Sequence, residues 1–88
     1  MFYIGQHKKG LMNGKGTLYF SDGNIIYDGE WLDDKYEGNG KLFNINGEYY
    51  IGQFKNGLKH GKGKEYDKNG NIIYDGEFIN DKKIGNVI

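Results

Sequence analysis

A short motif that begins with tyrosine recurs four times along this chain and constrains its fold more than any other feature. The motif reads Tyr-x-Gly-Gln or Tyr-x-Gly-Glu, and its leading tyrosines are separated by 24, 23 and 24 residues: Tyr3, Tyr27, Tyr50 and Tyr74. A period of this size is typical of repeat proteins, in which one unit cannot bury its apolar face alone. We therefore interpret each residue first by its place in the repeat.

Glycine and aromatic residues recur at fixed offsets from each leading tyrosine. Glycine lies 2, 11, 13 and 20 residues after it in most repeats. An aromatic residue follows at offset 4 in three repeats, as Trp31, Phe54 and Phe78, whereas the first repeat has His7 there. A second aromatic residue lies at offset 16: Tyr19, Phe43 and Tyr66. Alternate repeats resemble each other most, which indicates a duplicated unit of 47 residues.

The local sequence favours strands and hairpins. Segments rich in β-branched and aromatic residues predict first strands near 2–7, 25–31, 48–54 and 72–78 and second strands near 15–20, 39–44 and 62–66, with a short last strand at 85–88. Asp-Gly and Asn-Gly pairs predict tight turns at 21–24, 44–47 and 68–71. The links near 8–14, 32–38, 55–61 and 79–85 are expected to be loops. The spacing after Gly47 is one residue shorter than after Gly23, so we expect a bulge or a different turn at the second hairpin.

Alternation along a strand assigns residues to faces. The leading tyrosine, the glycine at offset 2 and the aromatic residue at offset 4 share one face. Ile4 and Gln6, Asp28 and Glu30, and their counterparts in later repeats then lie on the other face. The glycine leaves a gap between two large rings, and we expect the offset-16 aromatic residue of the adjacent strand to fill it.

The pattern resembles the MORN repeat (membrane occupation and recognition nexus), with matches from Tyr3 to Gly85. The resemblance implies an all-β fold: an elongated, single-layer antiparallel β-meander of about four hairpin repeats, twisted into a half-pipe. A single domain would cover residues 1–88, with repeats at about 3–26, 27–49, 50–73 and a truncated 74–88. The family also implies interaction rather than catalysis, through protein binding, self-association or suggested lipid binding. The chain departs from the family pattern at His7, and at Asp34 and Asp81, which replace the loop glycine found at Gly10 and Gly57.

Composition argues against several functional classes. The chain of 88 residues has no cysteine, so no disulfide framework or thiolate metal site is expected. No apolar run approaches the roughly 18 residues of a membrane span, and we predict a cytoplasmic protein. The formal net charge is zero and arginine is absent, which argues against nucleic acid as a partner. His7 and His60, the only histidines, lie two repeats apart, so we expect no metal, no cofactor and no enzymatic activity.

Two surfaces remain as candidate interaction sites. The first is the aromatic concave face, for a protein partner: Tyr3, Tyr27, Trp31, Tyr50, Phe54, Tyr74 and Phe78, with the offset-16 residues beside them. The alternative is that these rings only cover one another. The second is a basic rim for acidic lipids or an acidic partner: Lys8, Lys9, Lys55, Lys59, Lys82 and Lys83. Acidic residues of the second link, such as Asp33 and Glu37, interrupt this rim.

The sequence thus predicts a non-catalytic module that binds a protein partner through its aromatic face or its sheet edges. One alternative is a small inhibitor or immunity-type protein that occludes an enzyme, and another is a membrane-surface adaptor. The strand that begins at Phe2 has no polar cap before it, and an unpaired edge invites pairing with a second chain. We therefore also expect a homodimer.

Overall fold

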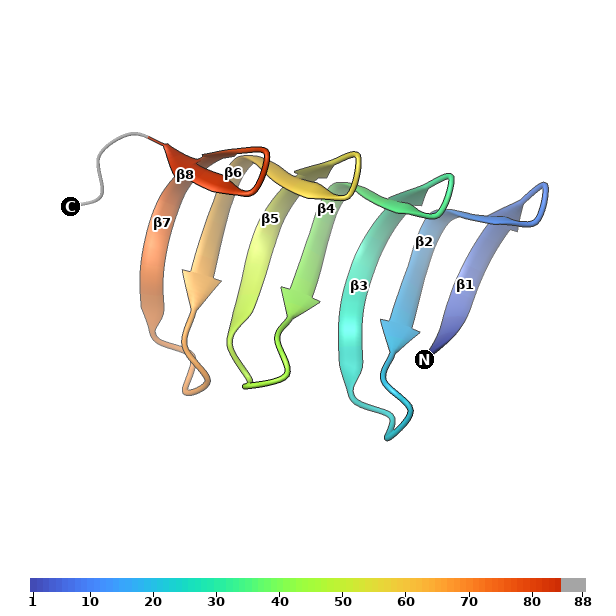
Figure 1. Cartoon of the computed structure of the whole chain (residues 1–88), viewed down its shortest axis with the longest axis horizontal. Helices are drawn as coiled ribbons and strands as arrows, with labels where there is room; N and C mark the ends of the chain where they lie inside the picture. The colour runs from blue at the N-terminus through green and yellow to red at the C-terminus, as the bar shows by residue number, and fades with distance from the viewer. Residues whose placement is uncertain (85–88) are drawn as a thin grey trace.

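The computed structural model describes residues 1–84, which form one open antiparallel sheet of eight strands in sequential order (Figure 1). The strands are β1 (Phe2–Lys8), β2 (Leu11–Tyr19), β3 (Ile25–Leu32), β4 (Lys35–Phe43), β5 (Tyr49–Lys55), β6 (Leu58–Tyr66), β7 (Ile72–Ile79) and β8 (Lys82–Ile84). The predicted all-β meander is confirmed, and the molecule is elongated, with extents of 43 × 26 × 14 Å. The strand predicted at 85–88 lies outside the described residues.

The links predicted as loops are two-residue turns, so that prediction was wrong. Both residues of each turn have positive φ, between 48° and 84°: Lys9–Gly10, Asp33–Asp34, Asn56–Gly57 and Asn80–Asp81. This is the turn geometry that matches the twist of a hairpin, and glycine, asparagine and aspartate reach it at low cost. The second strands therefore begin at Leu11, Lys35 and Leu58, well before the predicted starts.

The other three turns are alike, and the bulges lie elsewhere than predicted. Each turn has a bond across its base, such as Phe20 N to Asn24 O at 2.7 Å and Asn44 N to Glu48 O at 2.8 Å. The extra residue is absorbed within β3 and β7, where the register skips Ile26 and Ile73. The second hairpin has a regular register, so the bulge expected there is absent.

Strands β2, β4 and β6 each carry two extra residues near their start, relative to the strand before them. In the first repeat Gly5 pairs with Gly16, but His7 pairs with Met12, and Gly14 between them has a φ of 80°. The fourth motif residue satisfies the backbone at this irregularity: its side chain accepts a bond from Lys15 N at 2.7 Å in the first repeat. The same bond recurs from Glu30 to Asn39 N at 2.9 Å and from Gln53 to Lys62 N at 2.9 Å. The Gln or Glu of the motif thus has a structural role.

The leading tyrosines lie flat along the sheet and form its core. Each hydroxyl donates to the backbone carbonyl three residues later, at 2.8–2.9 Å. A phenol reaches that carbonyl only if the strand bends toward the ring, so this face, the tyrosine face, is concave. The ring of Tyr27 lies across Gly29 and Gly40, where an added Cβ would overlap it. The tyrosine itself therefore fills the gap that we assigned to an offset-16 aromatic residue, and that assignment was wrong.

The offset-16 aromatic residues instead lie on the opposite, outer face. Leu18 pairs with Tyr3, so the next residue, Tyr19, points to the other side of the sheet and pairs with Phe2. Phe2 and Tyr19 stack with ring centroids 4.8 Å apart, and Tyr49 and Tyr66 stack at 4.7 Å. Two aromatic layers thus sandwich the single sheet, which explains how so few apolar residues stabilise it.

Candidate functional site

Six of the seven predicted partner-binding residues are buried in the tyrosine face. Their side chains are at most 4% exposed: Tyr27, Trp31, Tyr50, Phe54, Tyr74 and Phe78. Each leading tyrosine meets the offset-4 side chain of its own repeat edge to face, at 5.0–5.1 Å between ring centroids. These rings cover one another, so direct partner contact with them stays a prediction. A partner on this face would first meet the side chains that lie over the rings.

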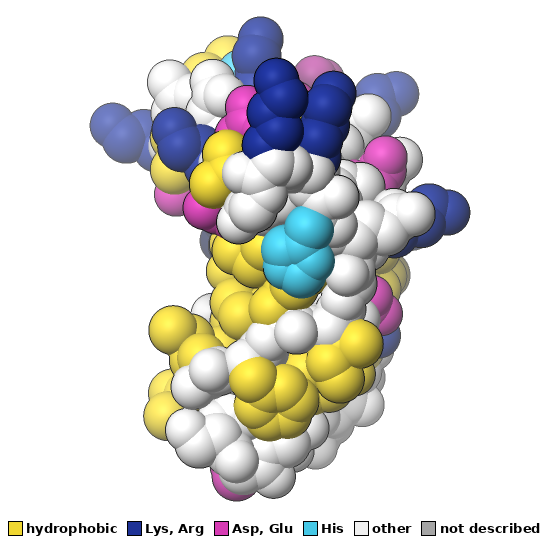
Figure 2. Space-filling view, turned by 90° about the vertical axis from the view of Figure 1, so that its right-hand side faces the viewer, with side chains coloured by type: hydrophobic (Ala, Val, Ile, Leu, Met, Phe, Trp, Pro, Cys, Tyr) yellow, Lys and Arg dark blue, Asp and Glu magenta, His cyan; other side chains and the backbone are white. Residues whose placement is uncertain are grey.

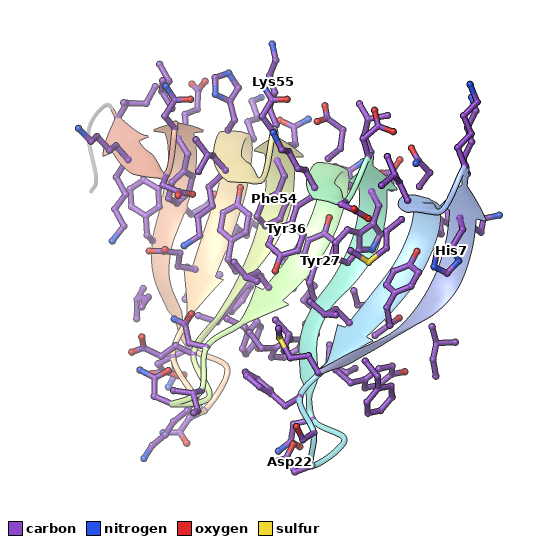
Figure 3. The ribbon with its side chains drawn as sticks, turned by 45° about the vertical axis from the view of Figure 1, so that its right-hand side comes forward. His7, Asp22, Tyr27, Tyr36, Phe54 and Lys55 are labelled. Atoms are coloured by element: carbon purple, nitrogen blue, oxygen red, sulfur yellow. The ribbon has the colours of Figure 1, made fainter. Side chains whose placement is uncertain are left out.

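The residue at offset 9 of each repeat lies on this face as a lid over the rings: Met12, Tyr36, Lys59 and Lys83. Tyr36 stacks on Tyr27 with centroids 3.9 Å apart. Lys59 Nζ lies 5.0 Å from the centroid of Tyr50, and Lys83 Nζ lies 5.2 Å from that of Tyr74. Figure 3 shows Tyr36 between Tyr27 and Phe54 in the middle of the sheet. This shared position was not predicted, because these residues were expected to lie in loops; their spacing of 24, 23 and 24 residues was the signal that relates them.

The residue at offset 15 also lies on the tyrosine face and divides it in two. It is Leu18 and Leu42 in the first two repeats but Glu65 in the third. With the lids, the first two repeats form an apolar half: Met12, Leu18, Tyr36 and Leu42. The later repeats form a charged half: Lys59, Glu65 and Lys83.

The charged half is a closed ion cluster. Glu65 accepts from Lys59 Nζ and Lys83 Nζ, each at 3.0 Å. Burial alone would raise the pKa of Glu65, but hydrogen bonds and charge from the two lysines outweigh it and hold the pKa below its usual value. Since Lys59 and Glu65 are only 20% and 19% exposed, the pair screens the rings beneath it from solvent.

The apolar half contains a hollow of about 220 Å³. Its lining combines side chains of β2, β3 and β4 with the turn before β6: Met12, Leu18, Trp31, Asp34, Lys35, Tyr36 and Gly57. The indole of Trp31 is fixed at its base, because Nε1 donates to Gly16 O at 3.0 Å. Burial raises the pKa of Tyr36. This hollow is an apolar recess of the tyrosine face that a partner side chain could enter.

The predicted basic rim is only partly formed. Lys8, Lys9, Lys55 and Lys82 are exposed at the two-residue turns. Figure 2, viewed onto the β1 edge, shows lysines gathered at the turn end and apolar side chains below them. Lys59 and Lys83 do not join the rim, because both are paired with Glu65 over the tyrosine face.

The remaining titratable candidates have structural positions. Asp28 accepts from Thr17 Oγ1 at 3.0 Å, and Glu30 accepts from Asn39 N, so this carboxylate pair is engaged by its own sheet. His7 packs edge to face on Tyr3 at 5.1 Å. Within residues 1–84, no group of three or more His, Cys, Asp or Glu side chains is placed to hold a metal ion.

The chain was compared with known proteins. A family model described as MORN repeat matches residues 3–25, 27–49, 50–72 and 74–85. No curated protein matches the chain. The part of the chain that the structure describes contains no helix long and apolar enough to span a membrane.

Proposed function

Because the chain belongs to the MORN repeat family, whose repeats are commonly protein- or membrane-interaction modules, we propose that it is a non-catalytic module that binds a protein partner. The partner occupies the apolar half of the tyrosine face. The observation that carries this proposal is the hollow over Trp31, whose apolar side chains are left without the ion pair that covers the later repeats.

The two halves of the tyrosine face carry different side chains at equivalent positions of the repeat. Positions that carry Lys59 and Glu65 in the third repeat carry Met12 and Leu18 in the first. The charged side chains of the later repeats are already paired with one another. Apolar side chains beside a concave recess instead gain free energy when a partner removes them from water, at about 25 cal/mol per Å². Interfaces are enriched in aromatic and methionine side chains, which this half supplies.

The test exchanges one half for the other. The double variant Met12→Lys, Leu18→Glu rebuilds in the first repeat the pair seen in the third, so the fold is expected to tolerate it. The control is Ile51→Asp on the outer face, where Asp28 and Asp75 occupy the same offset. Proteins from the native source are captured on the wild type and on both variants. A partner retained by Ile51→Asp and lost by the double variant supports the proposal; a partner retained by both refutes it.

The inhibitor alternative predicts the same face but a particular partner. A module that occludes an enzyme would capture that enzyme and abolish its activity in the purified complex. An unchanged activity of every captured enzyme would leave scaffold binding as the function.

Membrane-surface binding is a second candidate, favoured by the exposed lysines at one end of the sheet (Figure 2). Each lysine near an anionic surface contributes about 1 kcal/mol. The aspartates of the same turns, Asp33, Asp34 and Asp81, oppose this attraction. Co-sedimentation with phosphatidylserine vesicles tests the idea: it requires binding that the Lys8→Ala, Lys9→Ala variant weakens and that salt reduces.

A further inference from the structure

Adjacent repeats are joined at the turn end by a recurring backbone bond. In the second, third and fourth two-residue turns, the second residue donates its amide to the lid residue of the preceding repeat. Asp34 N donates to Met12 O at 3.0 Å, Gly57 N to Tyr36 O at 2.9 Å, and Asp81 N to Lys59 O at 2.9 Å. The three joints therefore have the same backbone geometry.

A carboxylate completes the first and third joints but not the central one. Met12 N donates to Asp34 Oδ1 at 2.7 Å, and Lys59 N donates to Asp81 Oδ1 at 2.7 Å. At the central joint the equivalent residue is Gly57, which has no side chain, so Tyr36 N receives no such carboxylate. A Cβ added to Gly57 would meet no atom within 4 Å, so the place of the carboxylate is open.

The open place borders the apolar hollow. Tyr36, Gly57 and Lys35 all line the hollow. Lys55, which is exposed, directly precedes the turn that contains Gly57. Asp34 also lines the hollow, but its carboxylate is bound to Met12 N at the first joint. An acceptor that enters this place would meet the backbone donor of Tyr36, with apolar side chains beside it.

We propose that the central joint recognises an acidic side chain of the protein partner. One carboxylate oxygen accepts from Tyr36 N, as Asp34 and Asp81 do at the neighbouring joints, and an adjoining apolar side chain of the same segment enters the hollow. This rests on the proposed function and specifies the partner: an exposed segment in which aspartate or glutamate adjoins a large apolar residue. Bonds to a charged acceptor are about twice as strong as neutral ones, which favours the acid over its amide.

The direct test uses capped dipeptides as probes, namely acetyl-Leu-Asp-amide and acetyl-Asp-Leu-amide, against their Asn counterparts. The ¹⁵N-labelled protein is titrated, and the Tyr36 amide signal is followed. We expect a saturable downfield shift of Tyr36 and about tenfold or greater preference for the acid, the effect of one charge-assisted bond. No saturable shift at tens of millimolar of any probe, or equal affinity for acid and amide, overturns the proposal.

A substitution at the joint gives an independent readout. Gly57→Asp supplies the missing carboxylate from within the chain, at a φ of 84° close to the 70° and 71° of Asp34 and Asp81. It should shift the free Tyr36 amide to the bound position, raise the urea midpoint and weaken probe binding about tenfold or more. The matched control is Gly10→Asp, which has the same turn position but lies between β1 and β2, away from the central joint, and should leave binding unchanged. Unchanged probe binding by Gly57→Asp refutes the carboxylate site.

The captured partner separates this inference from the proposed function. A partner lost by Met12→Lys, Leu18→Glu but retained in full by Gly57→Asp would refute the acidic site alone. A partner that neither variant affects would refute binding on the apolar half altogether. Loss with both variants, and retention by Gly10→Asp, is the expected result.

Discussion

Gly40→Ala tests whether glycine at this position is required by the tyrosine ring rather than by the backbone. Gly40 pairs with Gly29 in the adjacent strand, and its φ is not in the left-handed region. A Cβ at Gly40 would overlap Oη, Cζ and Cε1 of Tyr27. Since Tyr27 is completely buried, its ring cannot turn into solvent and has to push neighbouring rings aside.

The expected loss of stability follows from these contacts. Overpacking of a buried site costs about 1–3 kcal/mol. The displaced hydroxyl also loses its 2.8 Å bond to Glu30 O, which is worth about 1 kcal/mol. The smaller entropy of alanine in the unfolded chain returns about 0.4–1 kcal/mol. The net loss is therefore about 1–3.5 kcal/mol, a large part of the roughly 5–15 kcal/mol that holds a domain folded.

Urea unfolding, followed by the fluorescence of Trp31, measures this loss. A double-mutant cycle isolates its cause: leucine has no atoms where the Tyr27 ring meets the added methyl group. In the Tyr27→Leu background Gly40→Ala should cost at least 1 kcal/mol less than in the wild type. Equal cost in both backgrounds would show that the ring is not what excludes a side chain, and the explanation of the motif glycines would be wrong.

Three further predictions concern charge, ionisation and assembly. Glu65→Gln should lower the urea midpoint at pH 7, and the difference from the wild type should shrink as pH falls below 4.5, because the lowered pKa of Glu65 gives stability that is present above its unfolded-state pKa and lost as pH falls through the folded one; Asp75→Asn, in an exposed pair at 4.0 Å, should change little at pH 7. Burial raises the pKa of Tyr50 to about 12, so its contribution is full below pH 10 and lost as pH rises toward 12; tyrosinate absorbance at pH 11 should increase when urea is added, and no increase would contradict the burial of these phenols. The free edge of β1 should support a homodimer, visible by light scattering at micromolar concentration and abolished by Ile4→Lys; a constant mass of 10.1 kDa for the wild type would exclude it.

Periodicity alone was sufficient for the strand order, because the glycines and aromatic residues of each repeat keep fixed offsets. It was insufficient for the turns. Asn56–Gly57 is a typical two-residue hairpin turn, but Asp33–Asp34 and Lys9–Gly10 have no such signature. We predicted loops for all four links, although this one link carried the signature of a turn. The strand starts were therefore missed, and with them the lid position of Met12 and Tyr36.

The assignment of side chains to the two faces of the sheet was partly wrong for a related reason. The single-residue bulges at Ile26 and Ile73 change the parity on which alternation depends, whereas the two extra residues near each second-strand start preserve it. Alternation over the short first strands, from Tyr27 to Trp31, remained correct because nothing interrupts it on that side. The tyrosine ring covers the glycine of its own motif because the strand bends. No pattern in the sequence specified this bend.

The sequential strand order has a consequence for motion. Each strand makes its main contacts only with the strands before and after it in the chain. We therefore expect local opening to begin at the two ends of the sheet and to proceed inward one strand at a time. Amide hydrogen exchange should then be slowest in β3, β4 and β5 and faster toward β1 and β8. The hollow over Trp31 and the open joint at Gly57 lie in the middle strands, where we expect slow exchange. A ligand that binds there meets a surface already held in its binding conformation. Binding therefore orders little of the chain.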